Sequence, residues 1–134
     1  MNGGLVYLDS SAILKLVVSE PESGALVSLL AEWPLRISSE LAQTEVLRAL
    51  RRVKVTAHEF RRGEKVLARI SLIRLDQRIL RDAAMLQPPS LRTLDAIHLA
   101  TALSVHRDLA AVVTYDSRLA NASSDAKLTV WSPR

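Results

Sequence analysis

The stretch of sequence that decides the fold reads Leu5-Val6-Tyr7-Leu8-Asp9-Ser10-Ser11-Ala12-Ile13-Leu14-Lys15. Its first four residues form a short apolar run, which predicts a strand that is buried on both faces. From Ser10 onward the apolar residues recur with helical spacing, so the chain passes from strand to helix at Asp9. This is the beginning of an alternating strand–helix pattern, which is typical of α/β proteins.

The same alternation continues along the chain. Further strands are predicted at 35–37, 72–75, 111–114 and 128–131, and helices at 10–18, 19–32, 40–52, 57–69, 77–86 and 93–105. A capping box of Ser19 and Glu22 is expected to start the second helix, and Asp76 is expected to cap the fifth. The pattern predicts a three-layer α/β/α fold, with helices on both faces of a central parallel sheet of four to five strands.

Length and composition limit the class of protein. The 134 residues fit one domain spanning 1–134, and 49% apolar residues exclude a disordered chain. The absence of cysteine excludes a disulfide framework and a cysteine-based zinc site. The apolar stretch 5–18 is interrupted by Asp9 and Lys15 and is too short to span a membrane, so we expect a soluble cytoplasmic protein.

Positive charge is concentrated in one part of the chain. The net charge is +4, and residues 48–69 hold eight basic residues against two acidic ones. A basic surface favours a polyanionic partner, although the solvated outer faces of two helices give the same pattern. The candidates for phosphate contacts are Arg48, Arg51, Arg52 and Lys54.

Two acidic residues follow predicted strands. Asp9 comes directly after the first strand, and Asp116 follows the fourth strand by one residue. The carboxyl ends of parallel strands share one edge, and ligands bind there where the strand order reverses, so we expect both side chains at that edge. The alternative is that each acid only caps the helix that follows it.

Two further acidic residues lie on predicted helices. Glu45 has small or apolar residues at three of its four neighbouring helix positions, so its carboxylate is expected on the buried side. A buried carboxylate needs a partner or a metal, and the alternative partner is Arg48. Asp95 lies in the first turn of its helix, a position that the helix dipole alone favours.

Four acids at one edge of a sheet would repel one another unless a cation neutralised them. Carboxylate oxygens without a cysteine or a histidine cluster suit Mg²⁺ or Mn²⁺ better than zinc. His98 is a further candidate ligand, but a lone histidine on an apolar helix is more often a hydrogen-bonded core residue. Convergence of the four acids would therefore indicate a magnesium or manganese site.

Four segments, taken in order, resemble the PIN family and its VapC-like branch. They are 8–15 (LDSSAILK), 44–50 (TEVLRAL), 91–100 (LRTLDAIHLA) and 114–116 (TYD). The third segment is the most specific, and the order and spacing extend the resemblance over nearly the whole chain. The resemblance implies a PIN-like α/β/α fold and a metal-dependent endoribonuclease.

The resemblance also implies roles for individual residues. The implied ligands of Mg²⁺, or of Mn²⁺ in its place, are Asp9, Glu45, Asp95 and Asp116, and the implied polar supports are Ser11 and Thr114. The implied reaction is metal-assisted hydrolysis of an RNA phosphodiester bond. Many family members have one more acid near the fourth. The next acid here is Asp125, so one-metal and two-metal mechanisms both stay open.

A VapC-like toxin implies a VapB-like antitoxin that covers the acidic pocket, and an arginine of such a partner would suit the carboxylates. An apolar landing surface is expected near Trp33, formed by residues of two helices: Leu26, Val27, Leu29, Leu30, Leu41, Val46, Leu47 and Leu50. We also expect a homodimer, the commonest use of a leftover apolar face.

Four other interpretations stay open. Phosphoaspartyl hydrolases also place an Asp after the first strand, but they need Asp-x-Asp, whereas two serines follow Asp9. A receiver domain would use Asp76 after the third strand, but no lysine follows the fifth. A housekeeping PIN nuclease or a non-catalytic PIN-like scaffold would keep the fold, although the presence of all four acids argues against the scaffold.

Overall fold

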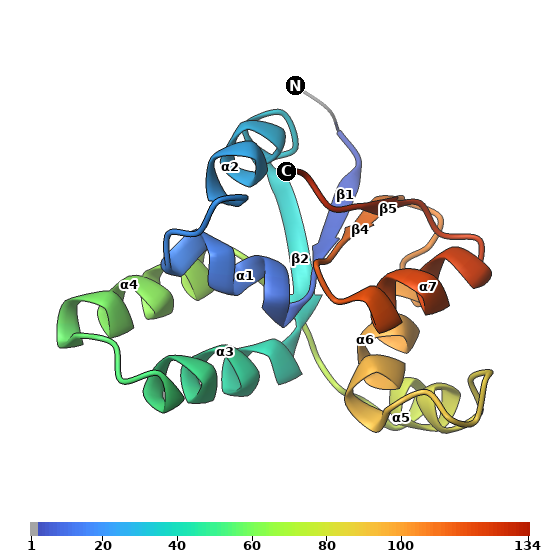
Figure 1. Cartoon of the computed structure of the whole chain (residues 1–134). Helices are drawn as coiled ribbons and strands as arrows, with labels where there is room; N and C mark the ends of the chain where they lie inside the picture. Colours follow the sequence, from blue (N-terminus) through green and yellow to red (C-terminus); the bar gives the residue numbers. More distant parts are fainter. Residues whose placement is uncertain (1–2) are drawn as a thin grey trace.

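Strand β1 (Leu5–Leu8) lies at the centre of a five-stranded sheet in the computed structural model, which describes residues 3–134 (Figure 1). The other strands are β2 (Leu35–Ser39), β3 (Ser71–Ile73), β4 (Leu109–Val113) and β5 (Val130–Trp131). Neighbouring strands pair in parallel, in the order β3-β2-β1-β4-β5. The expected α/β fold with a central parallel sheet is confirmed.

The strand order reverses beside β1. Tyr7 of β1 is in register with Ile37 of β2 on one side and with Val112 of β4 on the other. The chain therefore builds the sheet outward from β1 to β3 and then crosses back to β4, which creates a switch point at the carboxyl ends of β1 and β4. A receiver-like sheet has the order 2-1-3-4-5 instead, so the receiver interpretation is wrong.

Helices cover both faces of the sheet. On the left in Figure 1 lie α1 (Ser10–Val17), α2 (Ser23–Ala31), α3 (Glu40–Arg52) and α4 (Ala57–Ala68). On the right lie α5 (Gln77–Ala84), α6 (Thr93–Leu103) and α7 (Ser117–Asp125). Val6 and Leu8 of β1 pack in the core with α1 to α4, whereas Tyr7 packs with Ala102 of α6 on the other face.

Several predicted boundaries are wrong. Helix α7 was not expected, because its sequence SRLANASSD is polar and rich in serine. The capping box at Ser19 does not form, since α2 begins only at Ser23, whose hydroxyl accepts a hydrogen bond from Glu20 N and donates one to Lys15 O. Strand β4 ends at Val113, so two residues, not one, separate it from Asp116. The predicted cap at Asp76 is confirmed.

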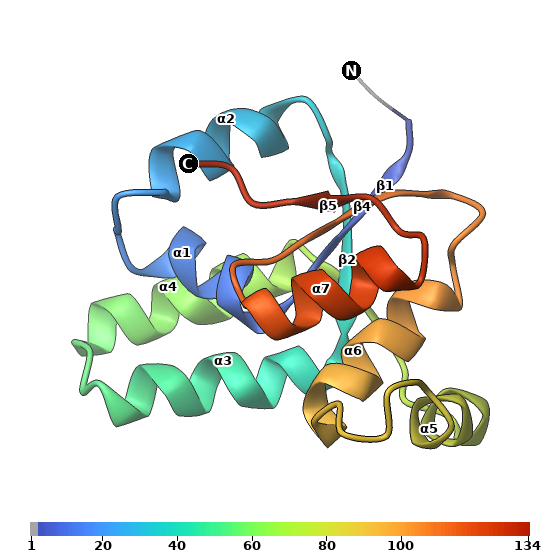
Figure 2. The same ribbon diagram turned by 45° about the vertical axis from the view of Figure 1, so that its right-hand side comes forward.

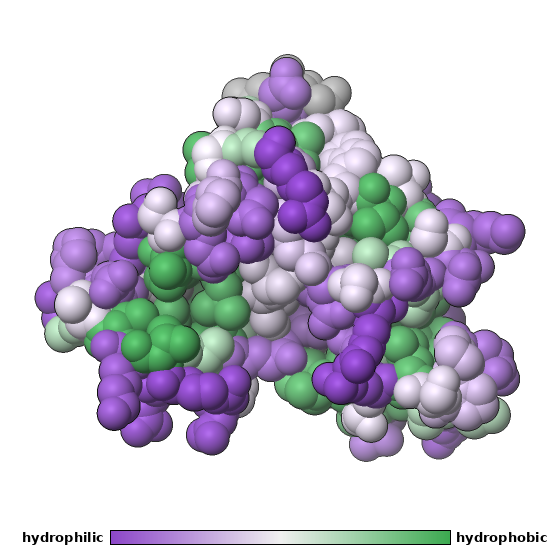
Figure 3. Space-filling view, viewed as in Figure 1, coloured by the Kyte–Doolittle hydropathy of each residue, from purple (hydrophilic) through white to green (hydrophobic). Residues whose placement is uncertain are grey.

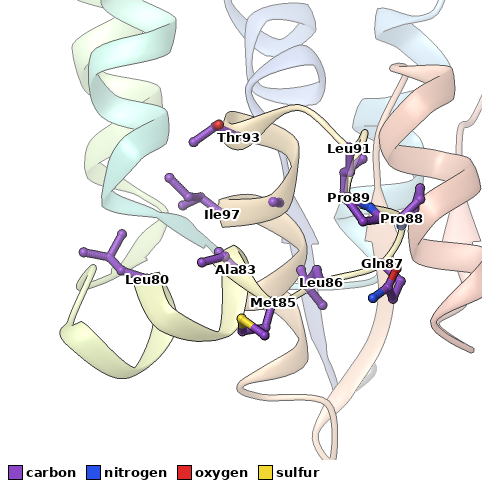
Figure 4. Close-up of a pocket in the computed structure, with 12 residues that line it drawn as sticks. Leu80, Ala83, Met85, Leu86, Gln87, Pro88, Pro89, Leu91, Thr93 and Ile97 are labelled. Atoms are coloured by element: carbon purple, nitrogen blue, oxygen red, sulfur yellow. The ribbon is translucent and has the colours of Figure 1, made fainter.

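The expected landing surface near Trp33 is largely core. Leu26, Leu30, Val46 and Leu50 are fully buried, because α2 and α3 turn these side chains toward α1 and the sheet. Val27 of this set stays exposed on α2, and other exposed apolar residues include Leu80 and Met85 near α5 and Leu94 on α6. Beside them a pocket of about 430 Å³ lies between α5, α6 and the proline-containing loop (Figure 4).

Within residues 3–134, none of the helices has the length and apolar character required to cross a bilayer.

Candidate active site

The first turns of α1, α3, α6 and α7 gather at the carboxyl edge of the sheet, in the lower centre of both ribbon views (Figures 1 and 2). Each of these helices carries one candidate acid at its N-cap or in its first two turns. The fold therefore brings to one edge four side chains that are far apart in the sequence.

Asp9 joins the end of β1 to the start of α1, and only 4% of its surface is exposed. Its carboxylate caps α1 by accepting a hydrogen bond from Ala12 N, as the simpler interpretation expected. It also accepts hydrogen bonds of 2.6 Å from the hydroxyls of Ser11 and Thr114. Burial raises the pKa of Asp9 although these hydrogen bonds oppose the rise, so the ionised form is costly without nearby positive charge.

The two predicted polar supports connect the β1–α1 junction to the β4–α7 junction. Thr114 Oγ1 accepts a hydrogen bond of 3.0 Å from Asp116 N, while it donates to Asp9. Ser11 Oγ accepts one of 2.9 Å from Tyr115 N. Both hydroxyls therefore hold the end of β1 against the end of β4, and with them the two acids.

Glu45 is held by two hydrogen bonds on one of its oxygens. His98 Nε2 lies 2.6 Å from Glu45 Oε1, and the hydroxyl of Ser10 donates to the same oxygen. Burial opposes ionisation of Glu45, but the hydrogen bond and the charge of His98, together with the hydrogen bond from Ser10, outweigh it and lower its pKa. The alternative pair with Arg48 is wrong, because Arg48 is exposed and Glu45 faces His98.

His98 is a buried, fully hydrogen-bonded histidine. A carboxylate only accepts, so the His98 Nε2–H must donate to Glu45, and in the neutral ring Nδ1 accepts the hydroxyl of Tyr7 at 2.7 Å. Burial raises the pKa of Tyr7, which keeps this hydroxyl protonated. The chain Tyr7–His98–Glu45 thus runs from the core to the edge of the sheet, and it fixes the orientation of Glu45.

Asp95 lies close enough to Asp116 for the two charges to interact. Asp116 caps α7 by accepting from Arg118 N and Leu119 N through Oδ1. Burial raises the pKa of Asp95, and the charges of Asp116 and Asp9 raise it further. Three of the candidate acids therefore lie close enough to repel one another.

No three His, Asp or Glu side chains within 3–134 form a ready-made ligand set. Glu45 is turned toward His98, and Asp9 toward Ser11 and Thr114. The chemistry of the donors nevertheless fits a hard divalent cation. Each of the four carboxylates keeps oxygen lone pairs that no donor in the described part of the chain occupies, and none of the four pairs there with lysine or arginine.

The four predicted phosphate-binding bases all lie on exposed surface at the end of α3: Arg48, Arg51, Arg52 and Lys54. Arg51 and Arg52 follow Glu45 by about two helical turns, or roughly 10 Å of helix. Within residues 3–134 none of the four bases forms an ion pair with the carboxylates.

Sequence reasoning missed two participants, Tyr7 and Ser10. Tyr7 belongs to an apolar run whose pattern indicates an ordinary core residue, and only its register beneath α6 reveals its hydroxyl as a partner of His98. Ser10 follows Asp9 directly, and the repeated hydroxyls at 10 and 11 were the signal that could have indicated it.

Comparisons with known proteins identify the family. The PIN domain model matches residues 6–124. Ribonuclease VapC46 of Mycobacterium tuberculosis is 47% identical over 128 residues, which cover 96% of this chain and 97% of the relative.

Solved structures share the fold at low sequence identity. The M. tuberculosis toxin VapC20, described as cleaving the sarcin–ricin loop, superposes with a TM-score of 0.74 at 14% identity, covering 96% of this chain and 99% of that one. A toxin–antitoxin complex from Klebsiella pneumoniae gives a TM-score of 0.71 at 23% identity, with 96% and 98% covered. The family model, the relatives and the acids at the switch point lead to one conclusion: this chain belongs to the PIN domain family, in its VapC-type branch.

Proposed function

We propose that this chain, as a single PIN-like domain over residues 1–134, is a Mg²⁺-dependent endoribonuclease that acts in the cytoplasm as the toxin of a VapBC-type pair. The observation that carries the proposal is the gathering of Asp9, Asp95 and Asp116 at the switch point, with Glu45 oriented beside them. The relatives named as ribonucleases support it.

In this proposal each carboxylate has a defined task. Asp9, Asp95 and Asp116 would supply oxygens to the cation, which would relieve the repulsion that the charges of Asp116 and Asp9 exert on Asp95. Glu45 offers Oε2, because His98 and Ser10 both occupy Oε1. Since the hydrogen bonds from His98 and Ser10 favour its ionised form, Glu45 can hold and orient a water molecule beside the scissile phosphate.

A bound Mg²⁺, or Mn²⁺ in its place, supplies Lewis acidity, which makes a water molecule more acidic and neutralises charge on the scissile phosphate. The protein contributes the rigid placement of its oxygens. Ser11 and Thr114 lock Asp9, and Tyr7 and His98 lock Glu45.

The purified chain is expected to produce new RNA ends in a total-RNA pool when Mg²⁺ or Mn²⁺ is present, and none when EDTA removes the metal. Sequencing of the new 5′ ends measures this. Asp108→Asn is the control variant, because Asp108 is an exposed acid before β4, at the opposite edge of the sheet. A chain that produces no new ends with either metal would contradict the nuclease proposal.

We further propose a VapB-like antitoxin that covers the carboxylates, supported by the toxin–antitoxin complex from Klebsiella pneumoniae, which shares this fold. Co-expression with the adjacent small open reading frame is expected to give a stable complex whose RNase activity is suppressed. Active enzyme recovered alone, without toxicity on expression, would instead favour a housekeeping PIN nuclease. A homodimer is part of the proposal, and the apolar surface of α5 and α6 is the face that supports it.

A further inference from the structure

A second pocket, of about 410 Å³, lies beside the carboxylates, between the loop that precedes α6 and the outer face of α7. We call it the α6–α7 pocket. Its walls carry Ser90, Leu91 and Arg92 from the loop, and Arg118, Asn121 and Asp125 from α7. Arg92 is the N-cap of the helix that holds Asp95, and Arg118 follows Asp116 by two residues. Both sides of the pocket therefore adjoin the candidate active site.

The pocket has a basic end and an acidic end. Arg92 and Arg118 are exposed, and within residues 3–134 neither forms an ion pair. Asp125 lies two helical turns beyond Arg118, about 10 Å along α7. No ion pair in the described residues fixes either guanidinium group, and Arg92 is close enough to Asp95 for its charge to favour the ionised form of that carboxyl. Hydrophilic surface covers the start of α7 in the space-filling view (Figure 3).

These groups match the parts of a nucleotide. A guanidinium group binds phosphate oxygens through two parallel hydrogen bonds. The Asn121 amide offers both a donor and an acceptor, which is what recognition of a base edge requires. Leu91 supplies an apolar contact, and the volume lies within the range of pockets that take small ligands.

The neighbouring pocket between α5 and α6 lacks the groups that would match a nucleotide. It is lined mainly by apolar side chains such as Leu80, Met85 and Ile97, and none of its lining residues in the described chain is charged (Figure 4). None of these side chains can form an ion pair with a phosphate. The two pockets on either side of the proline-containing loop therefore differ in chemistry.

We propose that the α6–α7 pocket binds one nucleotide of single-stranded RNA next to the scissile phosphate, with Arg92 and Arg118 on the phosphate and Asn121 on the base. The inference rests on the proposed ribonuclease function and extends it, because it names the residues that select the RNA. The RNA strand then crosses the carboxylates from the basic end of α3 to α7.

The test is binding of fluorescein-labelled single-stranded RNA oligonucleotides by fluorescence anisotropy, in EDTA so that the RNA stays intact. The double variant Arg92→Ala/Arg118→Ala is expected to raise Kd about tenfold or more. The slope of log Kd against log salt concentration should fall by about 0.7 for each phosphate of the single strand that the variant no longer neutralises. Arg107→Ala removes an exposed arginine near the opposite edge of the sheet, and it should change neither quantity.

Asn121→Ala separates base recognition from charge. It is expected to change the ranking of adenine, uracil and cytosine homo-oligonucleotides while the salt dependence stays as in the wild type. Equal Kd and slope for the double variant and Arg107→Ala would overturn the pocket while leaving the ribonuclease proposal intact. If the double variant loses antitoxin binding but binds RNA normally, the RNA-binding role of the pocket is also overturned, and the pocket is an antitoxin site instead. A wild-type chain that neither binds nor cleaves RNA would overturn both proposals.

Discussion

Asp9→Asn is expected to reduce RNA cleavage more than about 100-fold, because loss of a group that merely supports a metal ligand already costs about 10–100-fold. Asp9 accepts hydrogen bonds from Ser11 and Thr114, the two hydroxyls that hold the end of β1 against the end of β4. The amide is isosteric and can keep the cap hydrogen bond from Ala12, so the fold should remain. The measurement is the rate of cleavage in Mg²⁺, with Asp108→Asn as the control. Cleavage by Asp9→Asn at the wild-type rate would contradict the catalytic assignment.

In EDTA, Asp9→Asn is expected to be more stable than the wild type at neutral pH. The pKa of Asp9 is raised in the folded state by burial, so the protonated form stabilises the fold. That contribution is fully present below the ordinary aspartate pKa of about 3.9 and is lost as the pH rises through the raised value. At neutral pH the wild type therefore carries a buried charge that Asp9→Asn lacks.

Thermal unfolding between pH 4 and pH 7.5, in roughly the range where carboxyl groups titrate, is the measurement. The Tm of Asp9→Asn relative to the wild type should increase with pH in EDTA. Added Mg²⁺ should raise the Tm of the wild type, because only the folded state assembles the site, and raise that of the variant much less. A pH-independent difference would show that the charge of Asp9 is not the cause.

Glu45→Gln is the second variant with a large expected effect. The glutamine Oε1 can still accept from His98 and Ser10, so the hydrogen bonds that orient the side chain are kept. The free Oε2 is replaced by an amide nitrogen that cannot bind a cation. We expect cleavage to fall more than about 100-fold with little change in Tm.

Arg48→Ala is the matched comparison, one turn further along α3. Because Arg48 is exposed and does not pair with Glu45, its loss should weaken RNA binding and reduce the salt dependence without removing the chemical step. If Glu45 served only as a structural partner of His98, Glu45→Gln would cleave normally, and the ligand role would be wrong.

Most of the helices and the strands of the sheet could be predicted from the sequence, because each has a strong local pattern of apolar residues. Alternation of apolar strands and amphipathic helices indicated the parallel sheet, and the position of Asp9 after β1 indicated its open edge. Helix α7 escaped prediction, since its sequence is polar and serine-rich, and Leu119 and Ala122 are its buried apolar residues in the cluster that it shares with α6. The mistaken capping box at Ser19 shows that a local motif can be overridden when the hydroxyl of Ser23 finds backbone partners nearby.

By itself, the sequence indicated the order of the strands and of the first six helices and singled out the four acids as candidates, because strand–helix periodicity and the residues that follow strand ends are local properties of the chain. Only the tertiary structure decided how those acids are held. The contacts of Tyr7 with His98, of His98 with Glu45, and of Thr114 with Asp9 join residues that are 91, 53 and 105 positions apart. Such pairs depend on the parallel register of β1 with β4 and on the packing of α6 against the sheet, and no local pattern in the sequence specifies either.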